Sequence, residues 1–176
     1  MNRWQAQSAL IEAAVRQPVA ALRVLTGGCI GEVYRVDLRD GSTLVAKVDS
    51  SQSARLDIEG YMLRYLAEHS RLPVPAVRHS SAALLLMDFL PGSSLLTDAA
   101  QAHAADLLAD LHGVRGAAFG LERDTLIGGL PQPNPPTASW LDFFRDHRLG
   151  YMAKEAARAG ELPGAFLPRL ERFGER

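Results

Sequence analysis

The separation of strand-like from helix-like segments limits the fold of this chain more than any other feature. Short apolar runs that resemble strands are confined to residues 21–89, whereas Ala- and Leu-rich segments with helical spacing dominate beyond residue 92. Strands and helices that are segregated along a chain favour an α+β architecture. We therefore predict two lobes with a boundary near Pro91: residues 1–91 form a small antiparallel sheet with one packed helix, and residues 92–176 form a helical lobe.

The individual elements follow from apolar spacing and from turn residues. Alternation predicts strands, and apolar residues three or four positions apart predict helices. Gly, Pro and Asn between residues 128 and 136 predict a loop. The expected elements are a helix at 4–16, strands at 21–25, 33–38 and 43–48, a helix at 53–69, strands at 74–79 and 83–89, and helices at 99–112, from 140 through 152 and beyond, and at 166–173.

Composition and charge exclude several classes of partner. The 176 residues carry a formal net charge of -1, so the chain lacks the basic excess that binds nucleic acid or acidic membranes. No apolar run approaches the ~20 residues of a membrane span, and the N-terminus is too polar to lead a secretory signal. The single cysteine, Cys29, cannot form an internal disulfide. We therefore expect a cytoplasmic protein with a small-molecule ligand.

A glycine-rich turn joins the first two predicted strands. Its residues are Gly27, Gly28, Cys29, Ile30 and Gly31, and glycine lets backbone amides approach phosphate oxygens. A plain hairpin turn explains the same residues, so the turn alone does not identify a site. The turn leads into a strand rather than a helix, and no Gly-Lys-Ser/Thr follows it, which argues against P-loop and dinucleotide-binding folds.

Lys47 and Glu59 make this weak signal more specific. Lys47 is one of two lysines, with Lys154, among 19 Lys and Arg residues, and it lies on an alternating strand next to the glycine turn. An exposed lysine on an edge strand would show the same spacing. Glu59 shares a predicted helix face with Leu56 and Leu63, where a carboxylate is costly unless a cation meets it. A glycine turn, a strand lysine and a helix glutamate in this order predict the ion pair with which kinases orient ATP.

The last predicted strand leaves the first lobe through Met87, Asp88, Phe89 and Leu90. At such a connection between lobes, backbone amides and carbonyls can form hydrogen bonds with the edge of an adenine ring. We therefore predict that these four residues bind ATP through their backbone and that their side chains are not needed.

Seven runs of this sequence resemble those of a known family. They cover residues 27–34, 45–48, 59–63, 108–112, 119–121, 125–134 and 140–149. Together they look like the fructosamine kinases (ketosamine-3-kinases), and the last run is the most specific one because other kinase-like folds lack it. The resemblance implies a protein-kinase-like fold with ATP and Mg2+ as cofactors. It also implies phosphorylation of a sugar hydroxyl on small-molecule or protein-bound ketosamines, the adducts that sugars form with amines.

The catalytic residues of that family have no counterpart in this sequence. Family members carry a His-Gly-Asp catalytic loop with a downstream Asn, and then a second Asp that binds magnesium. His112-Gly113 lacks the aspartate, and Asp146-His147-Arg148 has the catalytic-loop letters in the wrong order inside a predicted helix. We therefore expect a truncated helical lobe with no catalytic residue and no metal ligand. The chain alone is expected not to phosphorylate ketosamines.

An incomplete second lobe has a consequence for the surface. Apolar side chains on the helices around Trp140 and Phe166 are expected to lie uncovered, which favours self-association or the binding of a missing segment. Cys29 offers a second route, because an exposed thiol can bridge two copies under oxidation. A half-buried filler residue is the simpler interpretation of that cysteine.

Two other functions remain open at this point. The first is a related phosphotransferase that acts on aminoglycosides or choline-like alcohols, which would share the first-lobe arrangement. The second is a non-catalytic nucleotide-binding or interaction module, which the absent catalytic loop supports. The run from residue 131 to residue 149 favours the ketosamine kinase over both.

Overall fold

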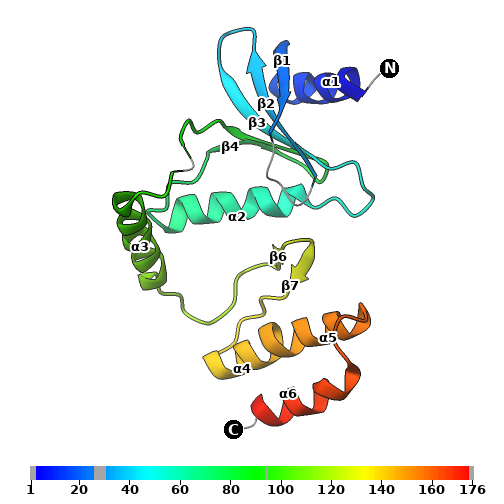
Figure 1. The fold of residues 1–176 in the computed structure, drawn as a ribbon, viewed down its shortest axis with the longest axis vertical. Helices are drawn as coiled ribbons and strands as arrows, with labels where there is room; N and C mark the ends of the chain where they lie inside the picture. The colour runs from blue at the N-terminus through cyan, green and yellow to red at the C-terminus, as the bar shows by residue number, and fades with distance from the viewer. Residues whose placement is uncertain (1–2, 26–30, 94, 175–176) are drawn as a thin grey trace. The chain divides into compact units, whose positions relative to one another are not determined.

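The computed structural model describes residues 3–25, 31–93 and 95–174 (Figure 1). The chain divides into two compact units, Met1–Val114 and Arg115–Arg176. This division falls after the helix at 98–113, whereas the sequence suggested a lobe boundary near Pro91, before that helix. The assignment of residues 1–91 and 92–176 to two kinase lobes stays a prediction.

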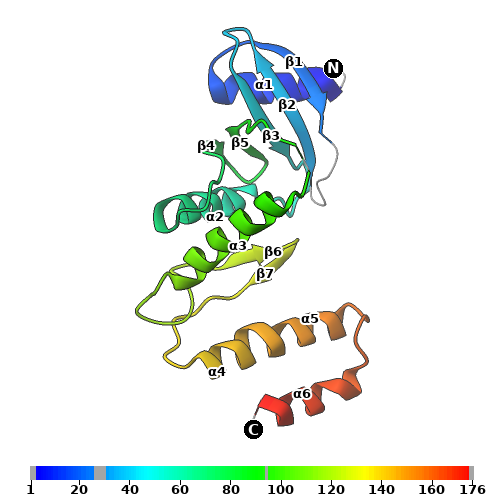
Figure 2. The ribbon, with the colours of Figure 1, turned by 60° about the vertical axis from the view of Figure 1, so that its left-hand side comes forward.

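The described part of the first unit contains three helices and five strands, and that of the second unit contains a hairpin followed by helices (Figure 2). The first unit comprises α1 (Arg3–Val15), β1 (Val19–Val24), β2 (Glu32–Leu38), β3 (Thr43–Val48), α2 (Leu56–His69), β4 (Val77–Ser80), β5 (Leu84–Asp88) and α3 (Asp98–Gly113). The second comprises β6 (Thr125–Ile127), β7 (Leu130–Gln132), α4 (Trp140–Phe144), a π-helical segment (Arg145–Gly150), α5 (Tyr151–Arg158), a 3₁₀ turn (Gly164–Phe166) and α6 (Leu167–Gly174).

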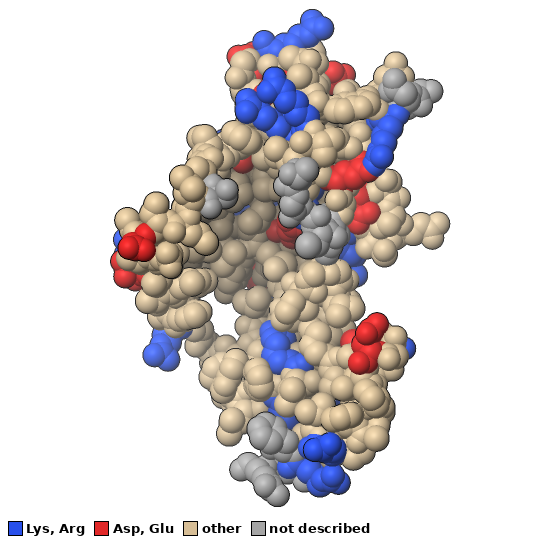
Figure 3. Space-filling model, viewed as in Figure 1, with Lys and Arg blue, Asp and Glu red and all other residues tan. Residues whose placement is uncertain are grey.

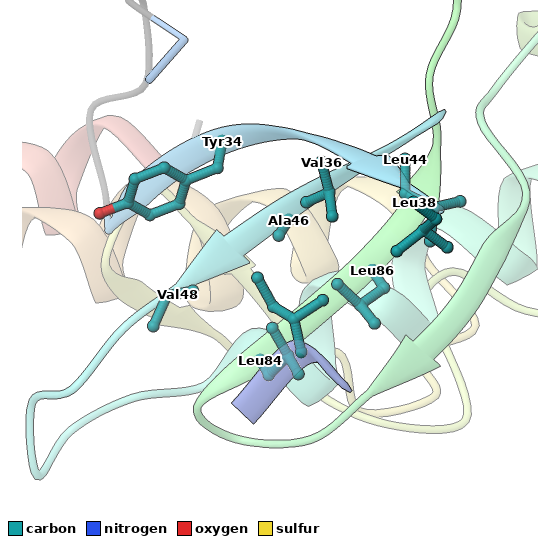
Figure 4. Close-up of a cluster of buried hydrophobic side chains, with 9 residues drawn as sticks. Tyr34, Val36, Leu38, Leu44, Ala46, Val48, Leu84 and Leu86 are labelled. Carbon is teal, nitrogen blue, oxygen red and sulfur yellow. The ribbon is translucent and has the colours of Figure 1, made fainter. Parts of the chain in front are cut away.

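The first unit is built on an antiparallel sheet with the strand order β1-β2-β3-β5-β4. Successive side chains of each strand point to opposite faces, and one face carries the apolar core, onto which Ile11 of α1 packs. Figure 4 shows these side chains converging from three neighbouring strands. The predicted α+β fold with a small antiparallel sheet is confirmed. The core consists of Ile11, Tyr34, Val36, Leu38, Leu44, Ala46, Val48, Leu84 and Leu86.

The opposite face of the sheet receives α2, which lies below the strands in Figure 1 and packs against β4 and β5. Leu85 points to this face and is fully buried. A Cβ added to Gly60 of α2 would lie 2.6 Å from the Cβ of Ser80 and 3.3 Å from Cδ1 of Leu85. Helix and sheet therefore meet at a point where only a glycine fits.

The helix α3 begins at a side-chain cap, since Oγ1 of Thr97 accepts a hydrogen bond from the backbone N–H of Ala100 at 3.2 Å. None of its residues is buried, and Leu108 is 49% exposed. Within the described ranges, no helix combines the length and the apolar character that crossing a bilayer requires.

Two features of the second unit differ from the sequence expectation. Residues 125–132 form a hairpin, so the prediction of a loop at 128–136 was wrong for β7. The pair Gly128-Gly129 between apolar residues is a two-residue hairpin signal, which had been interpreted as part of a loop. The helix predicted from residue 140 is present and runs to Arg158, but it contains the π-helical segment, where the N–H of Tyr151 bonds to the carbonyl of Asp146.

Candidate nucleotide-binding site

Lys47 lies on the face of the sheet opposite the apolar core. Its neighbours Ala46 and Val48 are buried in that core, so the alternation of β3 directs Lys47 to the face on which α2 packs. The side chain of Lys47 is 16% exposed. A lysine on an exposed edge, the alternative interpretation of the sequence, is therefore ruled out: β3 pairs with β2 on one side and β5 on the other.

Glu59 of α2 meets Lys47 as the sequence predicted. The ammonium Nζ lies 2.8 Å from Oε1 and 2.6 Å from Oε2 of the carboxylate. The glutamate side chain is 34% exposed, so the pair is partly shielded from water and is oriented by two charge-assisted hydrogen bonds. The ion pair itself is confirmed, and its contact with ATP stays a prediction.

Apolar side chains surround Lys47 on this face, and the sequence analysis did not single out most of them. The strand ladder pairs Lys47 with Val33 of β2 and with Leu85 of β5, and pairs Val45 with Met87 in the next row. Because alternate residues share a face, these four side chains form an apolar ceiling beside the ammonium group. Such a surface next to a cation suits a purine ring that carries a phosphate chain. The alternation of β2 and β3 is the signal that could have identified them.

Gly31 closes the predicted glycine turn. Its φ is +71°, in the left-handed region, and an added Cβ would lie 2.9 Å from the carbonyl oxygen of Val48. A residue with a side chain would thus be strained and would also clash with β3. The other predicted residues of the turn, at positions 27–30, lie outside the described residues, so their contact with phosphate stays a prediction.

The last residue of β5 and the residue that follows it are held by two arginines from other strands. Asp88 accepts hydrogen bonds from Nε of Arg78 at 2.6 Å and from Nη2 at 2.8 Å. The guanidinium of Arg35 lies over the ring of Phe89, 4.7 Å from its centroid. Leu90 follows with a side chain that is 55% exposed. Two of the side chains that the sequence analysis treated as unnecessary therefore have defined partners.

The Arg78 pair makes the stability of the first unit depend on pH. Its hydrogen bonds hold the pKa of Asp88 below the ordinary value of 3.8. A carboxyl whose folded pKa is depressed stabilises the fold above its unfolded pKa, and this contribution is lost as the pH falls through the folded pKa. We expect Asp88→Asn to lower the urea midpoint at about pH 7 and to have no effect well below pH 3.8. Asp106→Asn, on the exposed α3, should not reproduce this pattern, and an equal loss at both pH values would contradict the assignment.

In the second unit, Asn134 and Arg148 connect the proline-rich segment to the π-helical segment. Asn134 is 2% exposed, and its Nδ2 donates to Oγ1 of Thr125 at 2.9 Å and to the carbonyl of Arg123 at 3.2 Å. Its Oδ1 accepts from Nη2 of Arg148 at 2.5 Å. The same guanidinium lies 4.4 Å from the ring centroid of Phe143, and burial lowers the pKa of Arg148. The sequence analysis included both residues in runs that resemble the family, 125–134 and 140–149, but assigned them no contact.

The described residues contain no cluster of side chains that is typical of a metal site. Among them no group of three or more His, Cys, Asp or Glu side chains could hold a metal ion. On the face shown in Figure 3, acidic and basic side chains are scattered among neutral ones. The groups that suit a nucleotide are therefore Lys47, Glu59 and the apolar ceiling.

Most of this chain matches a known protein family. The model of the fructosamine kinase family matches residues 3–167. The chain belongs to the fructosamine kinase family. It is 34% identical over 168 residues to a probable ketoamine kinase of Synechocystis sp., a match that covers 91% of this chain and 57% of the relative. It is 28% identical over 137 residues to a chloroplastic protein-ribulosamine 3-kinase of Arabidopsis thaliana, with 74% of this chain and 41% of the relative covered. The chain thus spans about half the length of the curated relatives it matches.

Solved structures agree with the fructosamine kinase assignment. A putative fructosamine-3-kinase from Thermobifida fusca superposes with a TM-score of 0.80 at 26% identity, and the match covers 96% of this chain and 59% of that one. A macrolide 2'-phosphotransferase from Brachybacterium faecium gives a TM-score of 0.53 at 23% identity, with 96% and 60% covered, which shows a shared fold alone. The predicted kinase-like fold is confirmed.

Proposed function

We propose that this fructosamine kinase family chain supplies the nucleotide-binding part of an enzyme that phosphorylates a sugar hydroxyl on ketosamines with ATP. The observation that carries the proposal is the ion pair between Lys47 and Glu59 beside the apolar ceiling of the sheet. Glu59 fixes the direction of the ammonium group, so that Lys47 can contact the α- and β-phosphates without a large loss of side-chain entropy. Val33, Val45 and Met87 of the ceiling would pack on the adenine ring, whereas Leu85 is fully buried behind them.

The remaining predicted site residues complete this arrangement. Gly31 brings backbone close to β3 at the end of the glycine turn, where residues 27–30 would offer amides to the phosphates. Of the predicted residues Met87 to Leu90, Met87 and Asp88 are paired within the sheet, so the backbone of Phe89 and Leu90 would bind the adenine edge. Mg2+ would be bound through the phosphates of the nucleotide, since the described residues provide no cluster of ligands for it. Lys47, Glu59 and the apolar ceiling are the described groups that support the proposal of ATP as cofactor.

The acceptor class comes from the relatives rather than from a site in this chain. Their names refer to ketoamines and to protein ribulosamines, so ketosamines, free or attached to protein, are the proposed acceptors. We propose that the chain alone binds nucleotide without transferring phosphate, because its 176 residues contain no His-Gly-Asp motif. Phosphoryl transfer needs a residue that orients the hydroxyl, and positioning supplies most of the catalysis.

The first test is a thermal-shift titration of the chain with Mg·ATP. A ligand at a concentration 100 times its Kd stabilises the folded state by about 2.7 kcal/mol, which raises Tm by several degrees. Lys47→Met should weaken binding by roughly tenfold or more and remove about half of the shift or more, because the ammonium group that faces the phosphates is lost. Lys154→Met is the matched control, since it makes the same chemical change at an exposed position of α5.

The outcomes separate clearly. A shift that Lys154→Met retains and Lys47→Met loses supports the proposed site. Equal shifts in all three proteins would place nucleotide elsewhere, and the absence of any shift in the wild type would overturn the nucleotide-binding proposal. Turnover of a ketosamine by the wild-type chain would contradict the proposal that the chain alone is inactive.

Two further proposals concern location and assembly. The single cysteine supports a cytoplasmic location. Exposed apolar side chains support self-association through the second unit: Trp140 is 50% exposed, Leu141 76% and Phe166 42%. The route through Cys29 concerns a residue outside the described part of the chain.

Of the alternative functions, the family match favours the ketosamine kinase over an aminoglycoside phosphotransferase, and the non-catalytic module is compatible with nucleotide binding in the absence of turnover.

A further inference from the structure

The residues that follow β5 are not held by the strand ladder. The last paired residue of β5 is Asp88, opposite Leu44 of β3. Phe89 and Leu90 lie beyond this pair, so the sheet does not fix the orientation of their backbone N–H and C=O groups. Contacts of their side chains can supply the orientation that the ladder does not.

Arg35 of β2 provides such a contact. Its guanidinium lies 4.7 Å from the ring centroid of Phe89, within the range of a cation–π interaction. Arg35 shares the face of Lys47 and Val33, because all three occupy alternate or paired positions of β2 and β3. The contact therefore lies on the side of the sheet where the nucleotide is proposed to bind.

The guanidinium of Arg35 is itself oriented. Its Nε donates to Oδ1 of Asp37 at 2.9 Å, and the same oxygen accepts from Oγ1 of Thr43 at 3.2 Å. Arg23 of β1 pairs with the other carboxylate oxygen at 3.3 Å. The hydrogen bond from Arg35 is the largest cause of the lowered pKa of Asp37. Contacts from the three strands β1, β2 and β3 thus hold the guanidinium of Arg35 over the ring of Phe89.

The preceding residue is held from the opposite face. Asp88 and the core residues Leu84 and Leu86 occupy alternate positions along β5, and Asp88 therefore lies on their face of the sheet. Its carboxylate accepts hydrogen bonds from Nε and Nη2 of Arg78. Successive residues of the connection, Asp88 and Phe89, are thus fixed by arginines on opposite faces of the sheet. A planar fork that stacks and donates at the same time is specific to arginine, which lysine cannot replace.

We infer that Arg35 is a positioning residue for nucleobase recognition: by holding the ring of Phe89, it orients the backbone of Phe89 and Leu90 toward the adenine edge. This inference rests on the proposed function. The contact between Arg35 and Phe89 would determine which base is bound, and it would not affect the binding of the phosphates. Arg35 itself need not contact the nucleotide.

The test compares three ligands on the full chain: ATP, inosine triphosphate and inorganic tripolyphosphate. The two nucleotides differ at the purine edge, where an amino group is replaced by a carbonyl, and tripolyphosphate has no base. Arg35→Lys retains the charge and loses the stacking fork, and Phe89→Leu removes the ring while keeping an apolar side chain. Arg39→Lys, in the exposed turn after β2, is the matched control.

The wild type is expected to bind ATP more tightly than inosine triphosphate. Arg35→Lys and Phe89→Leu should each weaken ATP binding by roughly fivefold. The ratio between the Kd values for inosine triphosphate and for ATP should fall, and the Kd for tripolyphosphate should not change. Arg39→Lys should behave as the wild type does. An unchanged base preference in Arg35→Lys and Phe89→Leu, or an equal loss for all three ligands, would overturn the inference while nucleotide binding by the wild type stands. A wild type that binds none of the ligands overturns the proposed function and this inference together.

Discussion

Replacing Asn134 with leucine is expected to lower the unfolding free energy of the second unit by about 3 kcal/mol. Leucine branches at Cγ as asparagine does but is larger and neither accepts nor donates, so Arg148 loses the acceptor that lies 2.5 Å from its Nη2. Nη1 of Arg148 keeps the carbonyls of Pro133 and His147 as acceptors, but Nη2 loses a charge-assisted hydrogen bond at a partly buried position. The hydroxyl of Thr125, which accepts from Asn134 at 2.9 Å, loses its donor as well.

The two tryptophans make this measurement selective. Trp4 lies in the first unit and Trp140 in the second, and the chain contains no others. Urea unfolding followed by fluorescence in a Trp4→Phe background therefore reports on the second unit alone. Asn134→Asp is the matched variant: it keeps an acceptor for Arg148 and loses the two amide donors, so we expect an intermediate loss. A change in Asn134→Leu below roughly 0.5 kcal/mol would show that the network contributes little.

Gly60→Val is expected to destabilise the first unit by about 3 kcal/mol and to disturb the ion pair at the same time. The new Cβ would lie 2.6 Å from the Cβ and 2.9 Å from the Oγ of Ser80, so α2 must move away from the sheet. Glu59 is adjacent on the same helix, and its movement would lengthen the hydrogen bonds to Lys47. Loss of stability and loss of Mg·ATP binding should therefore appear together.

A double substitution tests whether close packing between Gly60 and Ser80 causes this loss of stability. Ser80→Gly removes the Cβ that the new side chain meets, so Gly60→Ala combined with Ser80→Gly should be less destabilised than the sum of the two single variants. Unfolding is followed through Trp4 in a Trp140→Phe background. Gly113→Ala serves as a control, because an added Cβ there has no neighbour within 4 Å. Simple additivity of the two substitutions would contradict the close-packing explanation.

The sequence predicted the ion pair because the argument was local and energetic. A carboxylate on a helix face that also carries leucines needs a cation, and Lys47 on the preceding strand was the obvious cation. The packing of α2 was predicted less well. The buried residues of this helix are Leu56, Ile58 and Gly60, whereas Leu63 is only half-buried. A glycine contributes nothing to an apolar pattern, so close approach of two backbones leaves no trace in periodicity.

The features that the sequence analysis missed depend on contacts between distant residues. Asn134 and Arg148 are polar and lie in a loop and a helix, and nothing in their spacing indicates that one buries the other. The contact between Arg35 and Phe89 spans more than fifty positions, and the interpretation of Phe89 as a residue that acts only through its backbone left its ring without a partner. The pair of Arg35 and Phe89 emerges only when the register of the sheet is known, and that of Asn134 and Arg148 only when the packing of the second unit is known.

The π-helical segment between α4 and α5 determines the direction in which the side chains of α5 point. An α-helix turns by about 100° per residue, so the extra residue that a π turn accommodates rotates everything after it by about that angle. Ala153, which is 8% exposed, therefore owes its inward direction to the number of residues between 145 and 150 as much as to its own identity. In this part of the chain a change of length by one residue would be more disruptive than most substitutions, because it would shift the phase of the helix.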